Sequence, residues 1–477
     1  MPEIFRTNSP LQYSALDGVI TSEIAPPLGV LRSGANNTFF LGRFQKGPAN
    51  DPTLIASVAE LQEKFGSGYP GNEALRLKRW SNVYILRVVA ANAIKAKADL
   101  ENSANVTLLV LTAKDSGKYG NTITVAISEG TMASTKKLTV KQGEVIEVFD
   151  NLKTAGLDNA ALAALIPSNL VVATEAHATL QPEDLDETAL TGGTDGTVAG
   201  TDYATALENA GVPVSGKIFF ADNQAADVKA ALSNHIKLNQ DGICVLGPEN
   251  LTTSVDDAVT DAQTYQDTNG RVLYAYNPPG FLVGSEVVYE SPVFLLSSIL
   301  NNSSPHVSPS AAQNSEFTQT AVRVRKNLSR ADLIKCKDAG IMAFENDIDL
   351  GVRIVSPVTG DPNTSVLRRR MSDFYIASVA RFLKNYQGQP NSMITRAAIK
   401  SAIVNFDDGL INDGILPSDA ELEDGGKARL IKTEGITSDV EKARGILKVE
   451  IKRRLFASAR FIVLIAEIGE SVTISEE

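Results

Sequence analysis

The chain after residue 201 alternates between short apolar segments and longer amphipathic segments. The expected order is strand 217–221, helix 225–238, strand 243–246, helix 254–268 and strand 271–276. The region before it opens in a similar way, with a strand 38–41, a helix near 53–65 and a strand 83–89. Apolar runs of this length suit buried strands, and their alternation with helices predicts an α/β domain with a largely parallel sheet.

A different pattern separates these two regions. Short strands with alternating apolar residues are predicted at 106–111, 121–127, 137–140 and 144–149, separated by Gly, Ser and Lys turns. The stretch ends near Thr191 to Gly196, where glycines favour a turn. We therefore predict one α/β domain, built from residues 25–97 plus 199–349, that is interrupted by a β-rich inserted domain at residues 98–198.

The two ends of the chain have their own patterns. Prolines at positions 2, 10, 26 and 27 favour an extended arm over residues 1–24. Two amphipathic helices are predicted near 371–386 and 394–410, with Ser392 as an N-cap and Gly414 as a stop. Strand candidates follow at 446–451 and 460–465. The C-terminal part, residues 350–477, is thus expected to be an α+β domain with a terminal arm.

The composition restricts the chemistry that the protein could perform more than it restricts the fold. The 477 residues include 43% hydrophobic and 21% charged residues, as in ordinary globular proteins, and the length suggests about three domains. Only three histidines and two cysteines occur, so a zinc site or a Cys/His nucleophile has few residues to form it. Neither a metal nor a cofactor is predicted, and no apolar run is long enough for a bilayer span.

One segment is similar to a nucleotide-binding loop. Residues 211–217 match G-x-x-x-x-G-K, but Ile218 stands where Ser or Thr would hold Mg²⁺, and two phenylalanines continue into a strand instead of a helix. A nucleotide-binding enzyme that uses Gly211 to Lys217 is therefore the disfavoured alternative, and we expect no enzymatic activity. A solvated turn is likewise favoured over a calcium loop at Asp347 and Asp349.

Charge is unevenly distributed. The net charge of −11 argues against a general affinity for nucleic acid or anionic lipid. Residues 368–400 nevertheless carry seven basic residues against Asp373 alone, and seven more from Lys442 to Arg460 accompany the single Glu450. A nucleic acid, an acidic protein surface, or the acidic run at 407–424 of a neighbouring copy would each complement this basic C-terminal region. A solvated loop is the default interpretation of that acidic run.

Several short motifs follow one another along the chain. They are Asp17-Gly18-Val19, Phe39-Phe40-Leu41-Gly42, Lys46-Gly47-Pro48, Asn50-Asp51-Pro52, Val83 to Val88, Gly117 to Asn121, Leu190 to Gly196 and Gly445 to Ile451. Taken in order, these motifs resemble the tail sheath family of contractile phages and related injection machines. Asp17 and Tyr119 depart from the Pro and Trp that the family usually has, and Ser116 also replaces a Pro.

This resemblance implies a structural subunit. Sheath subunits stack as six-fold rings around a tail tube, their N- and C-terminal arms add strands to the sheets of neighbours, and contraction drives the tube through the target cell envelope without ATP. The segments that would supply linking strands contain Val19, Ile20, Ile446, Val449, Ile451, Phe461 and Val463.

The resemblance also implies partners and a location. The expected partners are further copies of the chain, a tail tube protein, and baseplate and tail terminator proteins, with no direct nucleic acid and no stable membrane insertion. The expected location is the virion tail sheath, assembled in the host cytoplasm. Sheaths of bacteriocin-like, extracellular or type VI injection systems are the alternatives. The basic residues expected to face the tube, or else to pack within the sheath, are Arg368, Arg381, Lys384, Arg396 and Lys400.

Overall fold

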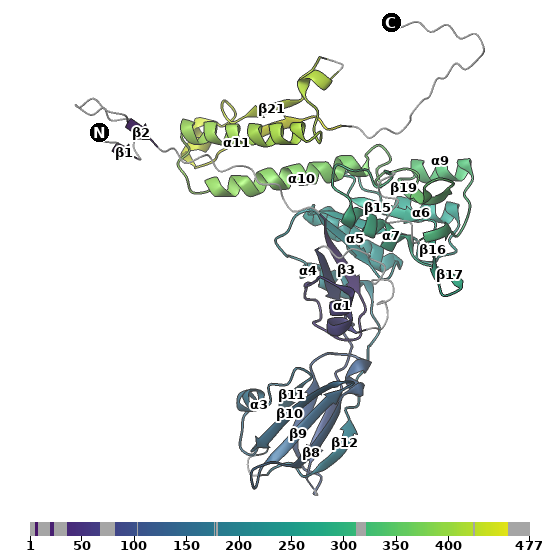
Figure 1. Ribbon diagram of the computed structural model, residues 1–477, viewed down its shortest axis with the longest axis vertical. Helices are drawn as coiled ribbons and strands as arrows, with labels where there is room; N and C mark the ends of the chain where they lie inside the picture. Colours follow the sequence, from purple (N-terminus) through teal and green to yellow (C-terminus); the bar gives the residue numbers. More distant parts are fainter. Residues whose placement is uncertain are drawn as a thin grey trace. The chain divides into compact units, whose positions relative to one another are not determined.

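The computed structural model divides the chain into two compact units. The large unit is Gly34–Asp373, and the small unit combines Phe374–Glu477 with Met1–Ser33 (Figure 1). The structure describes residues 5–7, 20–22, 36–66, 82–102, 104–175, 177, 180–311, 321–422 and 425–456.

An eight-stranded sheet forms the centre of the large unit. Its six inner strands are parallel, and one antiparallel strand closes each edge. In spatial order the strands are β20 (Gly351–Ile354), β19 (Ile341–Asp347), β15 (Val272–Tyr276), β14 (Ile243–Leu246), β13 (Lys217–Ala221), β3 (Asn37–Gly42), β5 (Val83–Arg87) and β4 (Thr53–Ile55). This arrangement confirms the predicted parallel α/β architecture.

Helices cover both faces of this sheet, so neighbouring residues of one strand enter different cores. Phe39 and Phe40 are both fully buried; Phe39 stacks on Phe219 in one core, and Phe40 stacks on Phe220 in the other. Burial on both faces explains why these strands are continuous apolar runs in the sequence. The helices are α1 (Val58–Phe65), α4 (Gly200–Glu208), α5 (Ala226–Asn239), α6 (Val255–Thr264), α7 (Pro292–Asn302) and α9 (Arg330–Asp338).

Two predicted boundaries differ from the structure of the large unit. The helix expected over 53–65 begins only at Val58, because Ser57 caps it by accepting a hydrogen bond from the Glu60 amide, and β4 precedes it at the sheet edge. Strand β20 pairs with β19, so the sheet of the large unit continues past the boundary predicted at residue 350. A small antiparallel sheet, β17 (Glu286–Tyr289), β16 (Pro279–Val283) and β18 (Ala321–Val324), completes this part.

The β-rich segment of the large unit has its own hydrophobic core. Two sheets and one helix enclose buried residues that include Leu111, Val125, Val140 and Leu162. One sheet has the order β10 (Val145–Leu152), β9 (Lys136–Gln142), β8 (Thr124–Glu129) and β12 (Leu185–Ala189), and the other β11 (Val171–Thr174), β7 (Thr107–Ala113) and β6 (Lys97–Glu101); α3 is Asn159–Leu165 (Figure 1). The strand predicted from residue 121 starts later, because Lys118–Thr122 form a 3-10 turn, η1.

The small unit is helical with short strands. Helix α10 (Val366–Leu383) contains the boundary between the units, and it is followed by η3 (Lys384–Tyr386) and α11 (Met393–Asn412). Ser392 caps α11 as predicted, and Gly414, at φ 67°, follows its end. The remaining elements are η4 (Asp419–Glu421), β21 (Arg429–Lys432), α12 (Asp439–Ala443), β22 (Glu450–Arg453) and a parallel pair, β1 (Phe5–Thr7) and β2 (Ile20–Ser22).

Candidate assembly surfaces

A two-stranded antiparallel sheet is the first candidate assembly surface of the small unit. Strand β21 pairs with β22 over four residues, with Ile431 opposite Ile451. Among the described residues neither strand has a second partner, so both outer edges of this sheet present main-chain groups. Such edges are templates for the addition of a strand from another segment or another chain.

A buried polar cluster fastens β22 to the helices of the small unit. The hydroxyl of Tyr375, on α10, donates to Asp407 Oδ1 of α11 at 2.7 Å, and Arg453 Nε lies 3.7 Å from Asp407 Oδ2. Arg453 also donates to the carbonyl of Pro417 at 2.9 Å. The side chain of Asp407 has no exposed surface, and burial raises the pKa of this carboxyl group. These three side chains therefore join two helices and the strand from the inside.

The second strand has a similar attachment. Arg429, in β21, forms an ion pair with Asp408 and donates to the carbonyl of Val404 at 3.2 Å, both on α11. The acidic run at 407–424 is thus not simply a solvated loop, because its first two carboxylates hold the sheet against a helix. Arg429 lies 21 positions from Asp408 and 25 positions from Val404, so the local sequence pattern could not reveal these contacts.

The predicted linking residues are partly described by the structure. Ile451 lies in β22, whereas Ile446 and Val449 precede that strand, since α12 ends nearby and Ile446 N donates to the Glu441 carbonyl. Ile20 belongs to β2. Val19, Phe461, Val463 and the strand candidate at 460–465 lie outside the described residues. The strand expected at 446–451 is therefore shorter and shifted toward residue 453.

The five basic residues expected to face a tube differ in their surroundings. Arg381, Lys384 and Lys400 are exposed in the small unit. Arg396 is held by Glu434 at 3.2 Å and by the Asn391 side chain at 2.9 Å. Arg368 is exposed but belongs to the large unit. These positions leave their role in tube contact a prediction.

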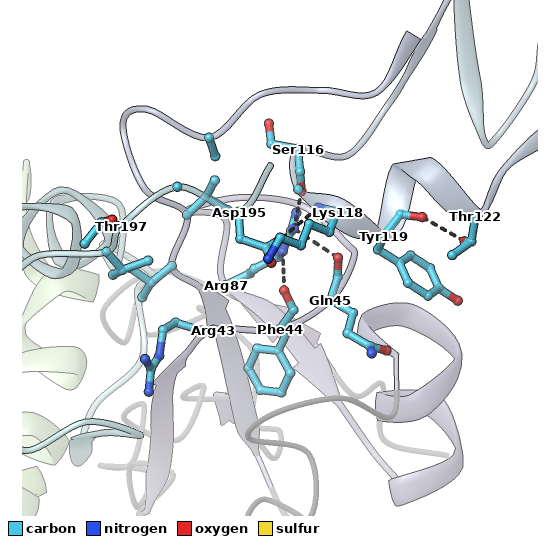
Figure 2. Close-up of a pocket in the computed structure, with 16 residues that line it drawn as sticks. Arg43, Phe44, Gln45, Arg87, Ser116, Lys118, Tyr119, Thr122, Asp195 and Thr197 are labelled. Carbon is cyan, nitrogen blue, oxygen red and sulfur yellow. Dashed lines mark hydrogen bonds between the residues drawn. The ribbon is translucent and has the colours of Figure 1, made fainter. Parts of the chain in front are cut away.

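Near the inserted segment, motif residues that are distant in sequence converge on Arg87. This buried guanidinium donates to the carbonyls of Phe44, Gln45, Gly47 and Ser116 at 2.6–3.2 Å (Figure 2). Burial lowers the pKa of Arg87, and the nearby carboxylates of Asp115 and Asp195 oppose that shift. One side chain therefore ties the end of β5 to the loop that follows β7.

The return of the chain from the inserted segment closes the same junction. Asn121 and Gly193 exchange two hydrogen bonds, and Asp195 Oδ1 accepts from the Lys118 amide at 2.7 Å. A Cβ at Gly117, where φ is 117°, would lie 2.7 Å from Asp195 Oδ1, so glycine is required there. A cavity of about 670 Å³ adjoins these residues (Figure 2). Several of the motifs that resemble the sheath family thus form the connection between two parts of the large unit.

Candidate catalytic features have structural explanations. Lys217 begins β13, is 5% exposed and forms an ion pair with Asp241, so the loop 211–217 leads into a strand and lacks the helix N-terminus of a phosphate site. Asp347 accepts from the amides of Asp349 and Leu350 in the β19–β20 turn. Within the part of the chain that the structure describes, no three His, Cys, Asp or Glu side chains gather to hold a metal ion.

The length and the apolar character of a helix decide whether it could span a membrane. None of the helices among the described residues is both long and apolar enough to cross a bilayer.

Comparisons with known proteins bear on the fold as a whole. No family model matches the chain, and no curated protein sequence matches it. The sheath tail protein Lin1278 from Listeria innocua aligns with a TM-score of 0.62 and 16% identity, covering 84% of this chain and 90% of that one. A sheath tail protein from Desulfitobacterium hafniense aligns with a TM-score of 0.62 and 15% identity, covering 92% and 100%.

A third solved structure extends the likeness beyond these two proteins. The helical sheath of the anti-feeding prophage in its contracted state aligns with a TM-score of 0.54 and 15% identity, covering 96% of this chain and 100% of that one. The likeness thus includes both units of the chain, as the order of the sequence motifs predicted. The chain has the fold of tail sheath proteins and of the sheaths of contractile injection systems.

Proposed function

We propose that this chain is the structural subunit of a contractile tail sheath. It would polymerise as stacked six-fold rings around a tail tube and contract without ATP, driving the tube through the target cell envelope. The observation that supports this most is the sheath fold over more than nine tenths of the chain. The open two-stranded sheet β21–β22 adds a place where subunits could join.

The linking step in this proposal is strand addition. An arm strand from a neighbouring subunit would pair with an outer edge of β21 or β22 and form main-chain hydrogen bonds along four residues. Each such bond contributes about 0.5–1.5 kcal/mol net, so one added strand supplies a few kcal/mol of binding free energy. In an assembly, many subunits would each contribute such a strand. The segments around Ile20, Ile446 and Phe461 are the candidate donors.

The partner of the basic surface is proposed to be an acidic tube protein. Arg381, Lys384 and Lys400 are exposed cations of the small unit. By contrast, Lys442, Lys448 and Lys452 already pair with carboxylates of their own unit, which weakens the case for nucleic acid. Baseplate and tail terminator proteins are the further proposed partners.

A phage tail in the virion, assembled in the host cytoplasm, is the favoured setting. Bacteriocin-like and extracellular injection systems remain alternatives, and a type VI system is disfavoured because its wall is usually made from two different chains. The genes beside this one would distinguish these settings.

Electron microscopy of the purified chain tests the proposal directly. Striated hollow tubes or rings are expected, and deletion of residues 1–20 should abolish them while the circular dichroism spectrum stays unchanged. A wild-type protein that stays a dispersed monomer at high concentration, with or without a co-expressed tube protein, would contradict the proposal.

A further inference from the structure

The chain passes between its two units twice. One crossing lies between Ser33 and Gly34, and the other lies between Asp373 and Phe374. Asn36 is the third residue after the first crossing, and Arg370 is the fourth residue before the second. These two residues are 334 positions apart, yet their side chains are hydrogen-bonded within the large unit.

Arg370 contacts Asn36 and the C-terminal end of α7 together. Its Nη2 atom donates to Asn36 Oδ1 at 2.7 Å, to the Leu300 carbonyl at 2.9 Å and to the Ser303 carbonyl at 2.6 Å. Its Nη1 atom donates to Ser303 Oγ at 3.0 Å. A cation at a helix C-terminus is favoured because the last carbonyls carry partial negative charge. The planar guanidinium can reach all these acceptors at once, which a lysine ammonium cannot.

Asn36 is fixed from its other side by the same helix end. Its Nδ2 atom donates to the carbonyls of Asn301 and Ser303 at 3.0 and 2.7 Å. Asn301 Nδ2 donates in return to the Asn36 carbonyl at 3.2 Å and to Thr38 Oγ1 at 2.7 Å. Asn36 has φ 68°, a left-handed conformation that asparagine adopts more readily than most residues. We name Asn36, Arg370 and the α7 end at residues 300–303 the crossing clamp.

A second contact holds the last turn before the other crossing. Asp373 receives two hydrogen bonds from the buried Arg271, at 3.0 and 3.1 Å, and one from Arg369 at 2.6 Å. Arg271 also donates to the Gly242 carbonyl at 2.9 Å. The start of α10 is therefore fastened to the large unit at Arg370 and again at Asp373.

We propose that Arg370 is a positioning residue that makes the crossing clamp bear force applied to the N-terminal segment. Without the clamp, a pull arriving at residue 36 would act directly on β3, an inner strand of the eight-stranded sheet. With the clamp, the pull passes to α7 and α10. The consequence for a sheath rests on the proposed function, whereas the clamp itself does not.

Hydrogen exchange of the full chain tests the clamp without reference to assembly. Arg370→Lys keeps the positive charge but loses the planar guanidinium group that binds several acceptors at once. We expect hydrogen exchange of the Asn37, Thr38 and Ser303 amides to become about tenfold faster or more, while the Leu273 amide in β15 stays protected. Arg330→Lys, at an exposed position at the start of α9, is the matched control and should change none of them.

A double-mutant comparison separates a clamp from a general core role. Asn36→Ala should raise exchange at Asn37 and Thr38 as Arg370→Lys does, and the double variant should be no worse than the stronger single variant. Unchanged exchange in both single variants, or effects that simply multiply in the double variant, would overturn the proposal. If Arg370→Lys fails to fold, Asn36→Ala alone gives the decision.

Assembly gives an independent readout. If wild-type tubes form, tubes of Arg370→Lys should break at lower guanidinium concentrations than tubes of Arg330→Lys; equal resistance would overturn the force-bearing role. If wild-type protein forms no tubes, the proposed function fails, and the exchange experiment still decides whether the clamp exists.

Discussion

The eight-stranded sheet of the large unit and the two-stranded sheet β21–β22 of the small unit differ in how deeply their strands are buried. Every residue of β3, β13 and β15 is buried, and the outermost strands of that sheet are short. In the small unit, β21 and β22 form a sheet of two strands with mostly half-exposed residues, and neither outer edge is paired by another described residue. Two strands alone are marginal in water, so β21 and β22 depend on ion pairs to α11. The first sheet buries its inner strands on both faces, whereas the second is small and half-exposed and is suited to extension by another segment.

The largest expected effect on stability concerns the eight-stranded sheet of the large unit. Phe40→Ala removes a fully buried ring that stacks on Phe220, and we expect the large unit to lose about 3–5 kcal/mol of unfolding free energy. Leu238→Ala, at an 82% exposed position of α5, is the control and should change stability by less than about 0.5 kcal/mol. Denaturant unfolding measures both. Equal effects would show that the sheet is not the stabilising core.

The next effect concerns the cluster beneath the open sheet. Asp407→Ala leaves Arg453 buried without its carboxylate and removes the acceptor of Tyr375, so the small unit should lose about 3 kcal/mol. Hydrogen exchange should rise in α11 and β22 and stay unchanged in β13. Asp408→Ala, which affects the more exposed pair with Arg429, is the milder comparison. A larger loss from Asp408→Ala would contradict the role assigned to the buried cluster.

A third change affects assembly more than stability. Arg381→Glu combined with Lys384→Glu reverses two exposed charges, so the monomer should keep its unfolding free energy within about 0.5 kcal/mol. Decoration of tubes should weaken if these residues meet an acidic tube protein. Glu434→Gln removes a negative charge and frees Arg396, another residue of the predicted tube-facing set, so it should strengthen decoration instead. Unchanged tube decoration by the double variant would remove these residues from the tube-contact surface.

The smallest effect is an acid transition in α12. Hydrogen bonds from Lys448 and Ser438 lower the pKa of Glu441 to about 2. Because the pKa is lower in the folded state, the stabilisation from Glu441 is present above the ordinary range near 4.5 and is lost as the pH falls toward 2. NMR titration of the Glu441 carboxyl measures this, and Lys448→Ala should move its pKa upward. A midpoint near 4.5 in the wild type would contradict the interaction.

Much of the architecture was predictable because local patterns report it. Continuous apolar runs indicated the buried strands β3, β13, β14 and β15, and the Ser392 cap marked the start of α11. The strands β6, β11 and β12 were not predicted. Strands β6 and β12 are mostly polar and exposed, and β11 has only four residues, so the pairing of these strands depends on neighbouring strands more than on their own sequence.

The candidate site residues show even more clearly that local patterns do not report contacts between distant segments. The run Arg368-Arg369-Arg370 looked like one basic patch, but Arg368 is exposed, Arg369 pairs with Asp373, and Arg370 is buried at the crossing clamp. Arg87 lies within the motif Val83 to Val88, and nothing in that motif indicates that it donates to four carbonyls. No spacing rule identifies Arg87 or Arg370, because the partners of these two residues lie 29 to 334 positions away.

By itself, the sequence determined the alternation of strands and helices, the scarcity of catalytic residue types, and an order of motifs that resembles sheath proteins. These depend on local periodicity and composition, which every short segment carries. Only the tertiary structure decided which charges are buried, which edges are open and where Asn36 meets Arg370. A charge acquires its role from the groups that replace its water, and those groups come together only when distant segments pack.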